Sequence, residues 1–129
     1  MRTIFCSSGI ILNKNKEILI NSRKNKKLLR SYWEFPGGKL KNTENFYQAL
    51  VREAKEELNI KLEISDIVPL TFVRHKYRDF HLFMYVFKVK KWSGDISSSD
   101  NEELKWVKSS KLKQQKILPA NKDIIKLLI

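Results

Sequence analysis

The chain has 129 residues, of which 26 are Lys or Arg and 14 are Asp or Glu, so its net charge is +12. This length predicts a single domain over residues 1–129, large enough to fold without a disulfide or a structural metal. No apolar run approaches the length of a membrane span, and the lone cysteine, Cys6, excludes an internal disulfide and favours a reducing, cytoplasmic compartment.

The first third of the chain predicts strands and loops. Residues 3–12 and 17–22 are apolar and rich in β-branched side chains, which predicts two strands joined by a turn. A basic loop follows at 23–32. The run Pro36-Gly37-Gly38 predicts that residues 33–38 form a tight segment that is neither helix nor regular strand.

The rest of the chain alternates helices and strands, so the fold expected is a mixed α/β domain. Residues 46–58 have helical spacing, and 61–73, 81–91 and 102–108 predict strands. A short C-terminal helix is expected from Pro119. Its inward-facing residues are predicted to be Ile124, Ile125, Leu127 and Leu128.

The positive charge is unevenly distributed. Residues 1–43 carry 10 basic and 2 acidic residues, residues 44–57 carry 2 and 4, and residues 58–129 carry 14 and 8. The basic flanks fit an interaction with polyanions. They equally fit the nucleotide bias of a genome, because Lys outnumbers Arg 20 to 6 and no zinc-finger, helix-turn-helix or RNA-binding motif accompanies them.

The helix predicted at 46–58 carries an acidic arc. Asn45 and Gln48 predict a capping box at its start, and Asn59 suits a left-handed residue at its end. Helical spacing places Glu53, Glu56 and Glu57 together, with the basic side chains of Arg52 and Lys55 expected to point elsewhere. Such an arc is either an ordinary acidic face or a site for a hard cation such as Mg²⁺.

The residues in and before this helix follow a specific spacing pattern. Gly38, Glu44, Arg52-Glu53 and Glu56-Glu57 resemble the Nudix box, G-x5-E-x7-R-E-U-x-E-E-x-G-U, in which U is a bulky aliphatic residue. Two positions depart from it: Ala54 replaces a bulky aliphatic residue, and Asn59 replaces a glycine. The resemblance implies an α/β/α sandwich with a mixed central sheet, a catalytic helix and a C-terminal helix.

The resemblance also implies a metal-dependent hydrolase that uses Mg²⁺ or Mn²⁺. Glu53, Glu56 and Glu57 would be metal ligands, one of them assisting the attacking water, and a backbone carbonyl of Gly37 or Gly38 would complete the shell. Glu44 and Arg52 would form a supporting pair. The further carboxylate that such proteins carry on a late loop would be Asp100, Glu102 or Glu103, with Asp100 preferred for its distance from Trp106.

Segments outside the box resemble MutT-type members of the family. They include Glu34-Phe35-Pro36-Gly37-Gly38 before the box and Pro119-Ala120-Asn121 near the end. Asn121 would recognise the base, since an amide both donates and accepts. The predicted substrate-binding residues are Arg23, near the leaving phosphates, with Glu34, Phe35, Phe80 and Asn121.

The implied function is hydrolysis of 8-oxo-dGTP and related purine deoxynucleoside triphosphates to the monophosphate and pyrophosphate. That activity would sanitise the nucleotide pool before DNA replication, and the protein would act as a monomer without nucleic acid. One alternative is another nucleoside diphosphate derivative: a dinucleoside polyphosphate, ADP-ribose or an RNA 5′ end. Another is a non-catalytic, basic module that binds nucleic acid.

Overall fold

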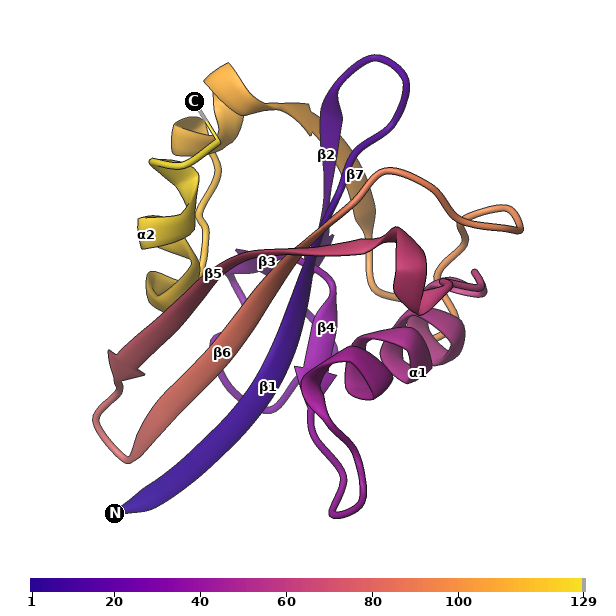
Figure 1. Ribbon diagram of the computed structural model, residues 1–129. Coiled ribbons are helices and arrows are strands. Elements are labelled where there is room, and N and C mark those ends of the chain that lie inside the picture. Colours follow the sequence, from indigo (N-terminus) through magenta and orange to yellow (C-terminus); the bar gives the residue numbers. More distant parts are fainter. Residues whose placement is uncertain (129) are drawn as a thin grey trace.

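The computed structural model describes residues 1–128 and shows strands between two helices that lie on opposite sides (Figure 1). The strands are β1 (Arg2–Ile11), β2 (Glu17–Ser22), β3 (Trp33–Glu34), β4 (Gly37–Lys39), β5 (Ile67–Lys76), β6 (Phe80–Val89) and β7 (Leu104–Lys108). The helices are α1 (Phe46–Leu58), α2 (Pro119–Ile125) and the 3₁₀ turns η1 (Ile64–Asp66) and η2 (Ser109–Gln114). The expected α/β class is confirmed.

The strands form two sheets with the orders β4-β1-β6-β5 and β3-β2-β7. β1 and β6 pair in parallel, and the other neighbours pair antiparallel. Parallel neighbours need a long crossover connection, and here that connection includes α1. The crossover thereby places the acidic helix beside the centre of the larger sheet.

Alternation along β1 divides the core into two layers, because successive side chains in a strand point to opposite faces. Ile10 packs in the layer that contains Ile124 of α2. Its neighbour Ile11 packs in the layer that contains Leu50 and Leu58 of α1. Both layers are fully buried at these positions, so the sheet is fixed between the two helices.

The ends of α1 follow the expected local rules. Asn45 Oδ1 accepts a hydrogen bond from the Gln48 amide at 2.8 Å, and Gln48 Oε1 accepts one from the Asn45 amide at 2.9 Å. Asn59 adopts the left-handed conformation with φ 60°. The predicted capping box and the predicted left-handed conformation of Asn59 at the helix end are therefore confirmed.

The prediction that residues 33–38 contain no regular strand is wrong. β3 pairs with β2, and Gly37 and Gly38 in β4 pair with Ser8 and Ser7 of β1. A Cβ on Gly37 would overlap the backbone carbonyl of Ser7. The glycines therefore permit this close pairing rather than prevent a strand.

Two further expectations are corrected. The strand predicted at 61–73 begins only at Ile67, because residues 64–66 form a 3₁₀ turn in which the Asp66 amide bonds to the Glu63 carbonyl. Leu127 does not face inward: α2 ends at Ile125, and the Leu127 side chain is 55% exposed. Among residues 1–128, no helix is both long and apolar enough to cross a membrane.

Candidate active site

A cavity of about 550 Å³ is bordered by β1, the basic loop, β4, α1, β6 and the start of α2. The structure brings most of the predicted site residues to its wall: Arg23, Glu34, Phe35, Gly37, Gly38, Glu53, Glu57, Phe80 and Asn121. Glu44, Arg52, Glu56 and Asp100 do not line it. The first three of these form an adjoining network.

Arg52 organises the acidic end of the site. Its Nε and Nη2 donate to the two carboxylate oxygens of Glu44 at 2.6 and 2.9 Å, which is a bidentate pair. Its Nη1 donates to Glu53 at 2.7 Å and to Glu56 at 3.2 Å. The expectation that Arg52 points away from the acidic arc is therefore wrong, whereas the predicted Glu44–Arg52 pair is present.

The same guanidinium also links the helix to β4. Arg52 Nη2 donates to the carbonyl of Lys39 at 2.9 Å. The hydrogen bonds from Arg52 hold the pKa of the Glu44 carboxyl low, at about 2. Arg52 thus fixes the loop that carries Glu44, strand β4 and helix α1 relative to one another.

Glu57 lines the cavity, and its largely buried carboxylate has no contact with Arg52. Burial, followed by the charge of Glu53, raises the pKa of Glu57 to about 8. Lys26 Nζ lies 3.8 Å from Glu57 and 3.6 Å from Asp100. The structure therefore places Asp100, on a late loop, next to α1.

The donor atoms at this end suit a hard cation. The Glu53 carboxylate lies against Gly38, where any Cβ would overlap it. In residues 1–128 no group of three or more His, Cys, Asp or Glu side chains is arranged to hold a metal. Mg²⁺ keeps several waters and needs few protein ligands, so Glu53, Glu57 and a glycine carbonyl are a fitting donor set.

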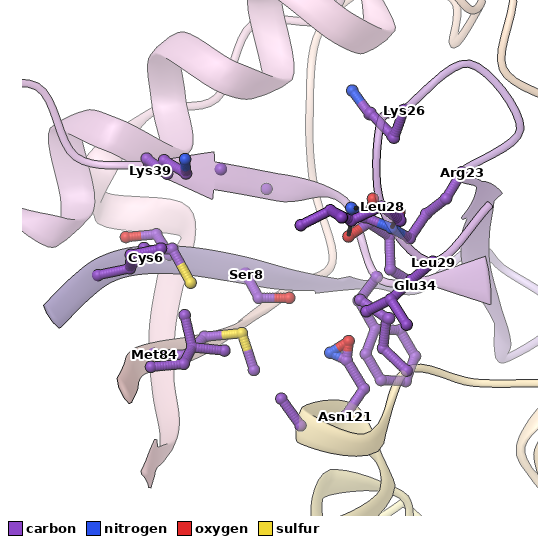
Figure 2. Close-up of a pocket in the computed structure, with 18 of the residues that line it drawn as sticks. Cys6, Ser8, Arg23, Lys26, Leu28, Leu29, Glu34, Lys39, Met84 and Asn121 are labelled. Carbon is purple, nitrogen blue, oxygen red and sulfur yellow. Dashed lines mark hydrogen bonds and ion pairs between the residues drawn. The ribbon is translucent and has the colours of Figure 1, made fainter. Parts of the chain in front are cut away.

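Arg23 and Glu34 form a second ion pair at the cavity. Arg23 Nη1 donates to Glu34 at 2.8 Å, and its Nε and Nη2 donate to the Leu28 carbonyl. Asn21 also donates to Glu34, at 3.4 Å. Burial raises the pKa of Glu34, although Arg23 opposes that shift. Arg23 therefore shapes the basic loop while it faces the cavity (Figure 2).

Aromatic and apolar side chains form another part of the wall. Phe35 is buried, and Phe80 stacks on Tyr77 with ring centroids 4.8 Å apart. The Tyr77 hydroxyl accepts a hydrogen bond from the Ala120 amide at 3.1 Å, which ties β6 and its hairpin to α2. Trp33 does not line the cavity, and Lys105 Nζ lies over its ring.

Asn121 lies at the start of α2 and is only 3% exposed. Its Oδ1 has no hydrogen-bond partner within the described residues. Buried polar atoms are nearly always paired, so this oxygen marks a place where a ligand group can bind. Cys6 also lines the cavity, but burial raises the pKa of its thiol to about 12, so it stays protonated.

Sequence reasoning did not identify the role of Glu102. This carboxylate is 4% exposed and accepts hydrogen bonds from the Ser22 hydroxyl at 3.0 Å and from the Asn25 amide at 3.2 Å. It therefore anchors the basic loop. Glu103 instead is exposed and pairs with Lys24 at 3.2 Å. Nothing in the spacing of these two glutamates distinguishes them before folding.

Comparison with known families gives one match to most of the chain. The model of the NUDIX domain matches residues 8–127. The chain is 37% identical to the 8-oxo-dGTP diphosphatase of Buchnera aphidicola subsp. Schizaphis graminum, over 91% of this chain and 86% of that protein. It is 29% identical to the CTP pyrophosphohydrolase of Escherichia coli (strain K12), over 86% of this chain and 81% of that protein.

Solved structures agree with this assignment of the fold. The MutT NUDIX hydrolase from Burkholderia pseudomallei superposes with a TM-score of 0.88 at 25% identity. The match covers 100% of both chains. The arrangement of two helices around a mixed sheet is therefore shared along the whole length.

Proposed function

Since the chain belongs to the NUDIX domain family, as a MutT-like hydrolase, we propose that its substrate is 8-oxo-dGTP. The products would be 8-oxo-dGMP and pyrophosphate, and related purine deoxynucleoside triphosphates would also be hydrolysed. The names of several relatives support this proposal. In the cell, the reaction would sanitise the nucleotide pool and prevent mutation.

One observation carries the proposal: the cavity joins an acidic end to a buried, unpaired amide. Glu53 and Glu57 line one part of it, and Asn121 lines another. In Figure 2, Lys26 lies above strand β1 and Asn121 lies below it. A nucleoside triphosphate has a matching layout, with a polyphosphate at one end and a hydrogen-bonding base at the other.

The acidic end would hold Mg²⁺ or Mn²⁺ through Glu53, Glu57 and a carbonyl of Gly37 or Gly38, with Glu56 and Asp100 as neighbouring carboxylates outside the cavity wall. Such a metal neutralises phosphate charge and activates water. Glu56 is the most exposed of the three helix glutamates, and Arg52 and Lys41 hold its carboxylate. The ion pair with Arg52 therefore sets the direction in which the Glu56 carboxylate would point toward a bound metal.

The chain's own cations would orient the polyphosphate. Lys26 lines the cavity 3.8 Å from Glu57, Arg23 lines it beside Glu34, and Lys39 also lines it. Arg23 retains N–H groups that its contacts with Glu34 and Leu28 do not use. These three side chains would bind the phosphates that leave, while Glu44 and Arg52 hold the helix in place.

The experiment is product analysis on a nucleotide panel with Mg²⁺: 8-oxo-dGTP, dGTP, CTP, a dinucleoside polyphosphate and ADP-ribose. We expect the highest kcat/KM for 8-oxo-dGTP, with pyrophosphate as a product. Glu53→Gln and Glu57→Gln should each lower kcat by about 100-fold or more while the protein stays folded. Turnover close to that of the wild type in both variants would contradict the proposed metal site.

Base recognition is tested separately with Asn121→Ala. This change should remove most of the preference for 8-oxo-dGTP over dGTP, since the buried, unpaired Asn121 Oδ1 would be the contact to the base. If CTP is the best substrate of the wild type, the enzyme resembles its CTP-hydrolysing relative in substrate. In that case the proposal for 8-oxo-dGTP is wrong, although the proposed metal site is unaffected.

A further inference from the structure

Two adjacent serines in β1 are both buried but differ in their hydrogen bonding. Ser7 is 1% exposed, and its hydroxyl donates to the Phe46 carbonyl at 2.6 Å. Ser8 is 2% exposed, and its Oγ has no partner within the described residues. Because they are neighbours in a strand, their side chains lie on opposite faces of the sheet. Both residues border the cavity, but the Ser7 hydroxyl is engaged in the contact with α1, whereas the Ser8 side chain lies on the other face.

The Ser8 hydroxyl belongs to a largely apolar part of the wall. It points from β1 into the space in front of Asn121 (Figure 2). Ser8 pairs with Val86 of β6 and with Gly37 of β4, and the apolar side chains of Met84 and Leu118 line the same cavity. Asn121 Oδ1, across this space, is the other buried side-chain atom without a partner among residues 1–128. Both unpaired atoms therefore border one cavity.

A buried hydroxyl without a partner is unfavourable, because it loses its hydrogen bonds to water and gains none in the protein. An alanine at position 8 would avoid that cost and fit the same strand. The unpaired atoms of Ser8 and Asn121 border one cavity, so a ligand with polar atoms along its edge could hydrogen-bond to both. A hydroxyl both donates and accepts, so it can pair with a ring carbonyl or a ring N–H.

We propose that Ser8 is a specificity-determining residue whose hydroxyl hydrogen-bonds to the base of the bound nucleotide, from the wall opposite Asn121. This inference rests on the proposed function, because it assigns a second polar contact in the same cavity. It adds that base selection is shared between β1 and α2. The apolar residues around Ser8 would contact the flat faces of the base and exclude water from these hydrogen bonds.

The test compares Ser8→Ala with Ser7→Ala as a matched control. Binding of 8-oxo-dGMP with Mg²⁺ is measured by titration calorimetry on the full chain, together with the melting temperature of each variant. Ser8→Ala should weaken binding by about 10-fold, as the loss of one buried hydrogen bond does. Its melting temperature should stay equal to that of the wild type or rise, because the variant lacks an unpaired hydroxyl.

Ser7→Ala should do the opposite. It removes a satisfied hydrogen bond to α1, so its melting temperature should fall while its affinity stays within about 2-fold of the wild type. Ser8→Thr keeps a hydroxyl on a β-branched side chain that suits a strand, and should restore binding relative to Ser8→Ala.

The outcomes separate this inference from the proposed function. Wild-type protein that binds 8-oxo-dGMP while Ser8→Ala binds it equally well would overturn the role of Ser8 alone. The Ser8 hydroxyl would then hydrogen-bond to water rather than to the base. Wild-type protein that binds no 8-oxo-dGMP but hydrolyses another nucleotide would overturn both. A lower melting temperature for Ser8→Ala would show that the hydroxyl has a structural role, and would also contradict the inference.

Discussion

The ammonium nitrogen of Lys26 lies 3.8 Å from Oε2 of Glu57 and joins the basic loop to helix α1. This contact only partly offsets the burial and the neighbouring Glu53 charge, which raise the pKa of Glu57 to about 8. In the unfolded chain the same carboxyl titrates near 4.5. Between these two values the folded protein therefore holds more protons than the unfolded chain.

It follows that the stability of the metal-free protein should fall as the pH rises from about 4.5 to about 8. Glu57→Gln cannot ionise, so it should reduce this decline and raise the melting temperature near pH 8. The pKa of Glu34 is shifted in the same direction, so part of the slope should remain. Thermal unfolding in EDTA across this range checks the prediction, with Glu63→Gln as an exposed control.

Arg52→Lys should impair activity although it keeps the charge. A lysine has no planar fork, so it cannot bind both oxygens of Glu44 and also reach Glu53, Glu56 and the Lys39 carbonyl. We expect kcat to fall about 10- to 100-fold as the glutamates lose their positions. Lys55→Arg, on the exposed side of the helix, is the control. Equal kcat in Arg52→Lys and the wild type would contradict the orienting role.

The two glycines of β4 should respond differently to alanine. At Gly38 a methyl group would overlap the Glu53 carboxylate, so Gly38→Ala should weaken Mg²⁺ binding and lower kcat with a modest loss of stability. At Gly37 it would overlap the Ser7 backbone, which cannot move aside, so Gly37→Ala should destabilise the fold by roughly 3 kcal/mol. Thermal unfolding and Mg²⁺ titration of activity on both variants check this. The same response in both would refute the distinction.

Glu102→Ala should affect substrate binding from a distance. It removes the acceptor for Ser22 and for the Asn25 amide, so the loop that carries Arg23 and Lys26 loses its anchor. We expect KM for the nucleotide to rise about 10-fold, with some loss of stability because the Ser22 hydroxyl loses its acceptor while it still accepts from the Glu103 amide. Glu103→Ala removes only an exposed ion pair with Lys24 and should leave KM within about 2-fold. Steady-state kinetics on the two variants distinguish them.

Helix α1 could be predicted because short-range rules determine it. The capping box of Asn45 and Gln48, the left-handed Asn59 and the spacing of Glu53, Glu56 and Glu57 all depend on residues within a few positions of one another. Helical geometry alone then places the glutamates on one side. For the same reason the Nudix box and the family could be identified from the sequence.

The long-range contacts could not be predicted in this way. Whether Arg52 meets the glutamates depends on where β4 and the Glu44 loop lie, and whether Gly37 and Gly38 form a strand depends on β1 as a partner. The sequence by itself thus determined the helix, its acidic residues and the family. The tertiary structure alone decided which of Ser7 and Ser8 is unpaired, because a strand residue's partner is set by the element that packs on its face.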